Sequence, residues 1–390
     1  MFDVVISGAG PSGSHCAKIL TEAGFRVALI EKNTRWRKPC GGAVHSSVVN
    51  LYPPLKKLTS QKVTGVVMHS ADYHRLEFEG SSDEFSIIVD RLELDNIMRD
   101  AALDAGAELF DNNVSYDFVV NNSQKMGVKA KSQTGTKEYL GKIIVIADGM
   151  SSKLAIKSGI RTKWINKELA IGKCAIIEGN HYLNLKRAYV FFTPFQGYGW
   201  IFPLNPKKYN IGIFTFGKDN LKHNIHQDYK NFVENTNITK LIPKSNNKVI
   251  WSSAYPFPAE GVLEKSLLFE NVMIIGDAGG FVSPISGEGI QSAVISGQIA
   301  AETAINALRN EDYSYTSLKI FRTNKEIKSI IRNFKLKLSM INFLYENGGS
   351  NLNKMFKLSE IDSEFREQVV NMFAFGLMPS KEFLEKVHSS

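Results

Sequence analysis

The feature that most constrains this chain is a glycine-rich turn between two short apolar segments near its start. Residues 3–7, DVVIS, are rich in β-branched side chains, and GAGPSG follows them at once. SHCAKILTEAGF then has helical spacing, and RVALIE is a second apolar run that ends in Glu31. Strand, tight turn, helix and strand in this order predict a βαβ unit.

The spacing of glycines in that turn has a physical meaning. Gly8 permits the tight turn, Gly10 lets the backbone approach a pyrophosphate, and Gly13 allows close packing of helix on strand. The N-terminus of the following helix supplies N–H groups and the positive end of a dipole. Glu31 comes 18 residues after Gly13, close to the roughly 20 typical of an acid that binds an adenosine ribose. These residues predict a dinucleotide site.

A second signal, at residues 271–305, indicates which dinucleotide binds. An apolar strand, NVMII, leads into Gly276-Asp277, then a glycine-bearing loop and a long helix of small residues. The carboxylate of Asp277 can accept hydrogen bonds from ribitol hydroxyls. Gly287 and Gly289 open the N-terminus of the next helix to an electron-rich ring. A flavin fits these features better than a nicotinamide.

The overall composition is that of a globular protein, with 390 residues of which 43% are hydrophobic. The chain starts directly with an apolar β run, so no export signal is expected. Cys16, Cys40 and Cys174 are widely spaced and predict reduced thiols in a cytoplasmic protein. No uncharged apolar run reaches the ~18 residues of a membrane-spanning helix.

Metal and nucleic-acid binding are not predicted. His15, His45 and His69 share no metal-ligand spacing, so we interpret them as surface or packing residues and expect no metal. The formal charge of +8 favours an acidic partner. No nucleic-acid-binding module accompanies the charge, so we do not expect nucleic acid to be that partner.

The middle of the chain, about residues 156–265, alternates β-rich segments with one helical stretch near HNIHQDYKNFVEN. This pattern predicts an antiparallel sheet. We expect β-rich segments between residues 60 and 90 to join it, so that this unit is assembled from two separated pieces of chain.

Together these motifs resemble a known flavoprotein superfamily. The order of GxGxxG with Glu31, DRLELD with Arg91, ADG at 147–149 and GDAGGFVSPISGEGI at 276–290 is similar to that of aromatic hydroxylases, flavin-dependent halogenases and geranylgeranyl reductases. Two further motifs, KPCGGAV at 38–44 and PFQGYGWIFP at 194–203, resemble the geranylgeranyl reductase branch. The resemblance covers about residues 1–310.

The resemblance implies an α/β fold in three parts. A Rossmann-like FAD-binding domain would take residues 1–60, 88–155 and 266–315. A mixed antiparallel β-sheet substrate domain with an apolar tunnel would take 61–87 and 156–265, and a C-terminal helical region would take 316–390. The implied activity is reduction of C=C bonds in isoprenoid chains of lipids or prenyl diphosphates.

The resemblance also assigns site residues. The cofactor FAD would be bound by Gly8, Gly10, Gly13, Glu31, Lys32, Cys40, Gly41, Ala43, Arg91, Asp277, Gly287, Gly289 and Ile290. Within this set Arg91 would lie near the diphosphate, Asp277 at the ribitol, and Gly289 and Ile290 at the isoalloxazine. The family has an arginine after ADG, where this chain offers Lys153 or Lys157, and lysine lacks the bidentate fork of arginine.

Alkene reduction needs a hydride from the reduced flavin and a proton at the other carbon. Cys40 is the candidate catalytic residue, because a thiol of ordinary pKa ~8.5 is mostly protonated at neutral pH. Tyr198, Trp200 and Phe202 are candidate substrate-binding residues. Tyr198 and Trp200 alternate along one predicted strand, so that their rings share a face and can stabilise a developing cation. The alternative interpretation is that Cys40 and these rings only pack, and we interpret Cys16 and Cys174 as core.

Residues 318–341 form a basic amphipathic segment. Ile327, Ile330, Ile331, Phe334, Leu338 and Ile341 recur at helical spacing. Around them lie Lys319, Arg322, Lys325, Lys328, Arg332, Lys335 and Lys337. One interpretation is a solvated cationic face over a packed one. The other is peripheral contact with an anionic membrane surface.

Three functions remain open from the sequence. The first is the isoprenoid reductase, the second a flavin-dependent monooxygenase or halogenase on an aromatic substrate, and the third an electron-transfer flavoprotein that reduces a quinone. The single dinucleotide fingerprint is already assigned to FAD. The electron donor is therefore either NAD(P)H bound transiently or a ferredoxin-like carrier.

Overall fold

The computed structural model describes residues 1–389 except 59–60, 81–84, 123, 160–162, 218–221, 244 and 375–379. The strands are β1 (Phe2–Ser7), β2 (Val27–Ile30), β3 (Ala43–His45), β4 (Gly65–His69), β5 (Arg75–Glu79), β6 (Ser86–Ile88), β7 (Glu108–Phe110), β8 (Val114–Asn121), β9 (Gln124–Ser132), β10 (Gly135–Ile146), β11 (Leu169–Glu178), β12 (Arg187–Phe192), β13 (Gly197–Asn205), β14 (Lys208–Thr215), β15 (Lys248–Pro258), β16 (Leu268–Phe269) and β17 (Val272–Ile274).

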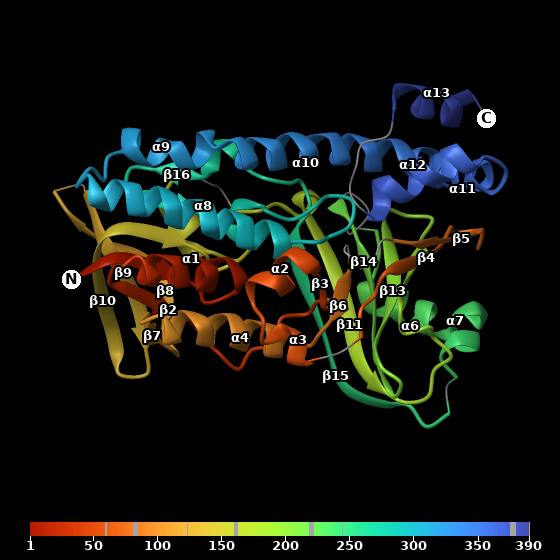
Figure 1. Cartoon of the computed structure of the whole chain (residues 1–390), viewed down its shortest axis with the longest axis horizontal. Coiled ribbons are helices and arrows are strands. Elements are labelled where there is room, and N and C mark those ends of the chain that lie inside the picture. The colour runs from red at the N-terminus through yellow and green to blue at the C-terminus, as the bar shows by residue number, and fades with distance from the viewer. Residues whose placement is uncertain are drawn as a thin grey trace.

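The helices are α1 (Pro11–Glu22), α2 (Ser46–Leu51), α3 (Leu55–Leu58), α4 (Arg91–Asp104), α5 (Lys153–Lys157), α6 (Ile225–Glu234), α7 (Thr236–Leu241), α8 (Ile290–Arg309), α9 (Tyr315–Thr323), α10 (Lys325–Leu344), α11 (Ser350–Ile361), α12 (Ser363–Ala374) and α13 (Lys381–Ser389). In Figure 1 helices α8 to α13 lie in the upper part of the view, α1 to α4 lie below them, and α6 and α7 lie at the lower right.

The first sheet has the strand order β16-β17-β10-β1-β2-β7, with β8 and β9 joined to β10. Its central pairs, β1 with β2 and β1 with β10, are parallel, so the N-terminal segment forms the predicted βαβ unit. The chain returns to opposite sides of β1, which creates a switch point at the carboxyl ends of β1 and β10. Ligands of open α/β sheets bind at such a point.

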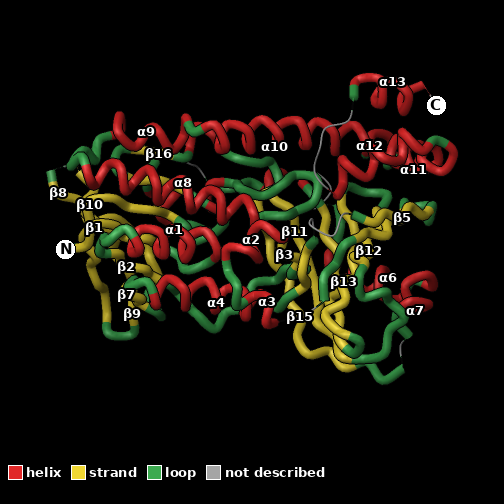
Figure 2. The backbone as a smooth tube through the Cα atoms, in the orientation of Figure 1, coloured by secondary structure: helices red, strands yellow, loops and turns green. Residues whose placement is uncertain are grey.

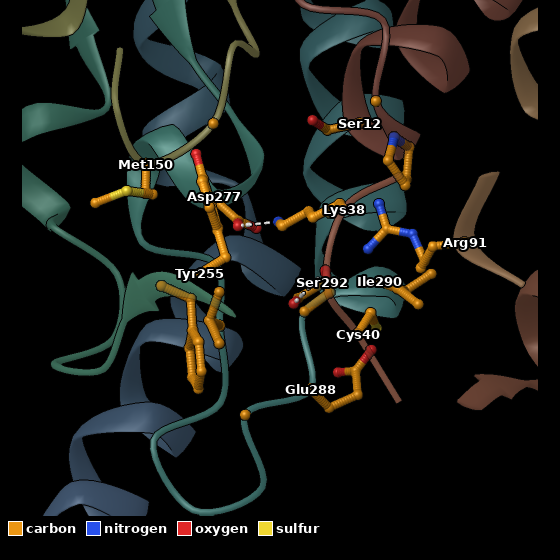
Figure 3. Close-up of a pocket in the computed structure, with 18 of the residues that line it drawn as sticks. Ser12, Lys38, Cys40, Arg91, Met150, Tyr255, Asp277, Glu288, Ile290 and Ser292 are labelled. Atoms are coloured by element: carbon orange, nitrogen blue, oxygen red, sulfur yellow. Dashed lines mark hydrogen bonds and ion pairs between the residues drawn. The ribbon is translucent and has the colours of Figure 1, made fainter. Parts of the chain in front are cut away.

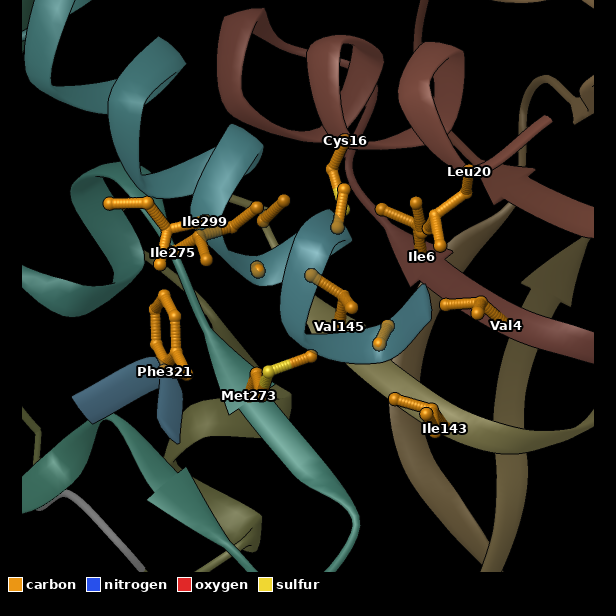
Figure 4. Packing of buried hydrophobic residues seen from close by; sticks show 14 of the residues in the cluster. Val4, Ile6, Cys16, Leu20, Ile143, Val145, Met273, Ile275, Ile299 and Phe321 are labelled. Atoms are coloured by element: carbon orange, nitrogen blue, oxygen red, sulfur yellow. The ribbon is translucent and has the colours of Figure 1, made fainter. Parts of the chain in front are cut away.

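One face of this sheet packs on helices α1, α8 and α9, as Figure 4 shows. Val4 and Ile6 of β1 face Cys16 and Leu20 of α1, and all four side chains are fully buried or nearly so. Cys16 is a packing residue, as predicted. The helical period of α1 and the two-residue period of β1 each place apolar side chains on one face, and these two faces pack together. This packing holds α1 against the strand, directly after the glycine turn.

The second sheet has the order β15-β11-β14-β13-β12-β4-β5 and lies at the right of Figure 1. Strands β4 and β5 join it, as the sequence predicted. The pairs among β11 to β15 are antiparallel and β4 pairs in parallel with β12, so the sheet is mixed, as expected. One expectation needs correction: β6, expected in this unit, pairs instead with β3 in a small sheet of its own.

Helices α10 to α13 cover the ends of both sheets, and α10 runs along the top of the molecule (Figures 1 and 2). The single amphipathic helix expected over 318–341 is wrong. The chain breaks at Asn324, whose extended backbone ends α9 and whose side chain accepts a hydrogen bond from the N–H of Glu326 at 2.8 Å. Asparagine is a favoured N-cap. Within the described ranges, no helix is long and apolar enough to cross a membrane.

The α/β class with a C-terminal helical region is confirmed. The exact division of the chain into three domains stays a prediction, and the β3–β6 pairing ties its first two units together.

Candidate active site

A cavity of about 770 Å³ lies at the carboxyl ends of β1 and β10 and extends toward the second sheet. Its size is within the usual range of small-molecule and cofactor sites. It brings together every predicted site residue except Gly13. The predicted residues on its wall are Gly8, Gly10, Glu31, Lys32, Cys40, Gly41, Ala43, Arg91, Tyr198, Trp200, Phe202, Asp277, Gly287, Gly289 and Ile290.

The glycine turn has the geometry that the motif predicted. Gly8 has φ +104°, and a Cβ there would lie 2.3 Å from the carbonyl oxygen of Ala147. A Cβ on Gly13 would lie 1.9 Å from the carbonyl oxygen of Gly8, so a glycine at this position lets α1 pack closely against the turn. By contrast, a Cβ on Gly10 would meet nothing within 4 Å, because Gly10 faces the cavity. Space for a ligand lies over Gly10.

Glu31 is held beside this turn by backbone groups. Its carboxylate accepts hydrogen bonds from the N–H of Ala9 at 2.8 Å and from the N–H of Asn33 at 3.0 Å. Lys32 extends along the same wall, with its Nζ 4.5 Å from the centre of the Trp36 ring. An oriented acid therefore lies directly after β2, where a ribose-binding residue is expected.

Of the two lysines offered after ADG, only Lys153 lines the cavity. Lys157 forms an ion pair with Asp117 at 2.7 Å on the outside of the molecule. Of the two lysines, Lys153 is therefore the candidate to replace the arginine that the resemblance implied after ADG.

Lys38 and Asp277 form an ion pair across the cavity, drawn as a dashed line in Figure 3. Both side chains are largely buried, with relative exposures of 22% and 11%. The sequence predicted Asp277 as a ligand-binding acid but did not predict its partner. The lysine preceding the Pro39-Cys40 pair was the available signal. The pair fixes the Asp277 carboxylate at the cavity wall.

The loop around Cys40 is tied to the second sheet by one buried side chain. Trp200 Nε1–H donates to Asn210 Oδ1 at 2.9 Å, and Asn210 Nδ2 donates to the carbonyl oxygen of Cys40 at 2.8 Å. Asn210 is 3% exposed. Cys174, interpreted as core, does belong to a buried cluster, and it also reaches the cavity with its Sγ 3.8 Å from the same carbonyl oxygen.

The two glycines after Cys40 are required by close contacts. A Cβ on Gly41 would lie 2.7 Å from the ring of Phe202 and 3.1 Å from Trp200 Nε1. Gly42 has φ +79°, and a Cβ there would lie 2.1 Å from the carbonyl oxygen of Val89. The loop has glycines at these two positions because β13 and the segment after β6 contact it from two sides and leave no room for side chains.

Arg91 lies behind this loop. Its guanidinium binds Asp95 through two nitrogens at 3.0–3.2 Å, and it also contacts the thiol of Cys40. Burial acts to lower the pKa of Arg91, but the Asp95 carboxylate and the Cys40 side chain raise it above its ordinary value. Burial likewise raises the pKa of Asp95, with Arg91 acting in the opposite direction. The proposed diphosphate contact of Arg91 stays a prediction.

Tyr198, Trp200 and Phe202 share one face of β13, as their alternation predicted, and all three line the cavity. The Tyr198 ring packs edge-on against Phe214 of β14 with ring centres 4.4 Å apart. A Cβ on Gly212 would lie 2.2 Å from the Trp200 ring, so the indole lies flat over that glycine. These side chains form an aromatic wall opposite the glycine turn.

Part of the cavity wall is apolar and comes partly from the C-terminal helices, where Asn333 and Lys337 also line the cavity. Its lining includes Ile285, Ile330, Phe334 and Phe373. Phe373 of α12 packs on Phe192 with ring centres 4.7 Å apart. The sequence interpretation placed the cavity in the first two domains only, and it missed this contribution because no motif marks it.

The histidines have structural environments. His15 Nδ1 lies 2.6 Å from the hydroxyl of Tyr52, and burial lowers the pKa of His15 to about 4. His69 stacks on Phe191 at 4.7 Å, and His45 caps α2. In the described part of the chain, no group of three or more His, Cys, Asp or Glu side chains could hold a metal ion.

Residues of this cavity fit a flavin dinucleotide. Gly10 and Gly289 are the N-cap residues of α1 and α8, and both glycines line the cavity. Neither glycine has a side chain to cap its helix, although at α8 the Glu288 carboxyl group accepts the N–H of Gln291. Helix N-termini of this kind bind phosphate and other electron-rich groups. The hydroxyl of Ser283 is buried at the same wall without a hydrogen-bond partner. The fold and this cavity define a flavoprotein that is built around two large sheets.

Comparison with known proteins supports the same class of cofactor. Residues 1–309 match the family model described as FAD binding domain, and the chain belongs to that family. Its cofactor is FAD.

The names of individual relatives state a narrower class of flavoprotein. The chain is 28% identical to a digeranylgeranylglycerophospholipid reductase of Methanosphaerula palustris, over 86% of this chain and 85% of the relative. It is 26% identical to the protein of that name from Methanocella arvoryzae, over 96% and 91%. A geranylgeranyl bacteriochlorophyll reductase-like structure from Thermoplasma acidophilum superposes with TM-score 0.84 at 19% identity, covering 100% of this chain and 98% of that one.

Flavin-dependent halogenating enzymes share the fold as well. A flavin-dependent brominase superposes with TM-score 0.69 at 18% identity, over 94% of this chain and 98% of that one.

Proposed function

We propose that this protein is an FAD-dependent reductase that saturates C=C bonds in the geranylgeranyl chains of glycerophospholipids or prenyl diphosphates. Its archaeal relatives carry the name of such a reductase and align over most of their length. The observation that carries the proposal is the chain of contacts from the aromatic wall through Asn210 to the Cys40 loop.

These contacts hold two walls of the cavity in place. The space between the walls can accept both a flat ring and a long apolar chain. On one side the glycine turn, Glu31 and the Lys38–Asp277 pair bind and orient the cofactor. On the other, Trp200 and Tyr198 face the space in front of the Cys40 loop. When bound and reduced, FAD supplies the hydride.

The apolar part of the cavity wall accounts for the proposed substrate. Ile285, Phe334 and Phe373 offer no hydrogen bonds to a polar substrate but bury apolar surface, which favours an isoprenoid chain at about 25 cal/mol per Å². The aromatic faces exclude water from the double bond and stabilise positive charge that develops on it. We propose these roles for Tyr198, Trp200 and Phe202.

The electron donor and the membrane contact are also proposals. The donor is a reduced nicotinamide or a ferredoxin-like carrier. Exposed apolar side chains, Ile320 at 52% and Leu336 at 42%, lie among lysines and arginines of α9 and α10, which supports docking on anionic lipid where the substrate resides.

The function is tested by following the flavin spectrum without oxygen. The holoenzyme is reduced with one equivalent of dithionite and mixed with a geranylgeranylated glycerophospholipid, or with geranylgeranyl diphosphate. The matched control is the fully saturated phytanyl lipid. We expect reoxidation with the unsaturated lipid and none with the saturated one.

Other results would favour the other functions. Stable reduced flavin with every lipid, followed by substrate-dependent oxygen consumption with an aromatic compound in air, would favour a monooxygenase or halogenase. Reoxidation by a quinone but by no lipid would favour electron transfer. Either result would overturn the reductase.

A further inference from the structure

A carboxylic acid and an amine line the cavity, and neither has a part in the function described so far. Glu288 belongs to the loop before α8, and Lys337 belongs to α10; both line the cavity. Figure 3 draws Glu288 and Cys40 in the same part of the view, on the side away from the Lys38–Asp277 pair, and both residues line the cavity. The sequence motif around Gly287 and Gly289 contains Glu288, but only its glycines were assigned a role.

The Glu288 carboxyl group is held on a rigid loop. It accepts a hydrogen bond from the N–H of Gln291 at 2.7 Å, and the carbonyl oxygen of Glu288 accepts one from the N–H of Ser283 at 2.8 Å. The hydroxyl of Tyr198 donates to the carbonyl oxygen of the neighbouring Ser286. Glu288 is thereby fixed beside the aromatic wall.

The surroundings raise the pKa of this acid above its ordinary value. Burial raises the pKa of Glu288, and Asp277 adds to the rise, while the N–H groups of Gln291 and Ile290 and the amine of Lys337 oppose it. Burial lowers the pKa of Lys337, and Glu288 acts in the opposite direction. Tyr198 also interacts with Glu288, and burial keeps that phenol protonated by raising its pKa.

The thiol of Cys40 has a partner within its own loop. The N–H of Gly42 donates to Cys40 Sγ at 3.4 Å.

We propose that Glu288 is the proton donor of this site; this inference rests on the proposed reductase function. The O–H bond of Glu288 breaks and its proton bonds to one carbon of the alkene, as the π bond breaks. A hydride with its electron pair bonds to the other carbon, and the reduced flavin that supplies it becomes oxidised. The Glu288 carboxylate takes a proton from solvent before the next turnover.

The test compares Glu288→Gln and Glu288→Asp with wild-type holoenzyme in the anaerobic reoxidation experiment. Glu302→Gln, at an exposed position of helix α8, which follows the Glu288 loop, is the matched control. We expect reoxidation by unsaturated lipid to slow about a hundredfold or more in Glu288→Gln. Glu288→Asp keeps an acid and should retain part of the rate. Reduction by dithionite and FAD content should be unchanged in all of them.

Two further measurements separate proton donation from a merely structural role. The wild-type rate should fall as pH rises through the raised pKa of Glu288, and in Glu288→Gln this dependence should be absent. Infrared difference spectra between neutral and alkaline pH, taken without lipid, should show a protonated carboxyl band in wild type that Glu288→Gln lacks.

The outcomes are distinct. A Glu288→Gln rate within twofold of wild type, with the same pH profile, would overturn the inference and leave the reductase intact. The absence of lipid-dependent reoxidation in wild type would overturn both. A normal rate in Glu302→Gln, with loss in Glu288→Gln and partial recovery in Glu288→Asp, supports the proton donor.

Discussion

Lys38 and Asp277 lie 239 residues apart in the chain and form an ion pair inside the cavity. The lysine belongs to the loop that carries Cys40, and the aspartate follows β17 of the first sheet. One contact therefore joins the cofactor side of the cavity to the loop proposed to face the substrate. Both side chains are largely buried, so removal of either partner leaves the other without its counter-charge.

Replacement of Asp277 by asparagine should weaken FAD binding. Asparagine keeps the shape but removes the charge that holds Lys38 and a strong acceptor for ribitol hydroxyls. Hydrogen bonds to charged groups contribute about 1.5–3 kcal/mol, so we expect the Kd for FAD to rise roughly tenfold or more. Flavin fluorescence quenching on titrating apoprotein measures it. Glu264→Gln removes the partner of Lys335 outside the cavity and should leave the Kd unchanged; an equal Kd in Asp277→Asn contradicts the assignment.

Replacement of Asn210 by leucine should destabilise the fold and the Cys40 loop together. Leucine has a similar volume but leaves Trp200 Nε1–H and the Cys40 carbonyl without their shared partner. Each buried group left unpaired costs about 1–3 kcal/mol. Urea unfolding of the holoenzyme should show this loss, whereas Asn231→Leu, at an exposed position of α6, should not. Equal midpoints for the two variants would show that the bridge is unimportant.

Membrane docking should depend on the exposed face of α10. Lys328, Arg332 and Leu336 are exposed and follow at four-residue spacing, so they share one face. Each basic residue near an anionic surface contributes about 1 kcal/mol, so Lys328→Glu with Arg332→Glu should weaken sedimentation with phosphatidylserine vesicles by roughly thirtyfold or more. Lys337 is not part of this face, contrary to the sequence interpretation, because it lines the cavity.

The control for docking is the same charge change elsewhere, in Lys207→Glu with Lys240→Glu, both exposed. Equal weakening by the two double variants would mean that net charge alone attracts the protein to lipid.

Acid should destabilise the protein through His15. Burial lowers the pKa of His15 from its ordinary 6.5 to about 4. The unfolded state thus binds the proton first, and stability falls as pH drops from 6.5 toward 4, by roughly 3 kcal/mol in all at 1.36 kcal/mol per pKa unit. In His15→Gln, which can still bond Tyr52, urea unfolding at pH 7.5 and 4.5 should show a smaller loss. The same loss as in wild type would contradict this.

Local patterns predicted much of the site. Gly8, Gly10 and Gly13 act through backbone geometry close to their own positions, and Glu31 follows its strand directly, so a short motif determined their placement. Tyr198, Trp200 and Phe202 share a face because a strand has a period of two. These residues depend little on the rest of the fold.

What the sequence did not predict depends on contacts between distant segments. Asn210 meets Cys40 only because β13, β14 and the loop pack together, and Phe373 reaches the cavity only because α12 folds over the second sheet. Lys337 was counted with a solvated face because helical spacing shows which residues share a face, and the surroundings of that face come from the tertiary fold. The break at Asn324 did have a signal, since asparagine favours helix starts.

The most direct test of the central claim is the mass of the lipid after reaction. Dithionite-reduced wild-type holoenzyme is incubated without oxygen with a geranylgeranylated glycerophospholipid, alongside Cys40→Ala, and the extracted lipid is analysed by mass spectrometry. The account predicts mass gains in steps of two hydrogens with wild type, and slower gains with Cys40→Ala because the loop beside the substrate is altered. Unchanged lipid in the presence of fully reduced, FAD-loaded wild-type protein would contradict it.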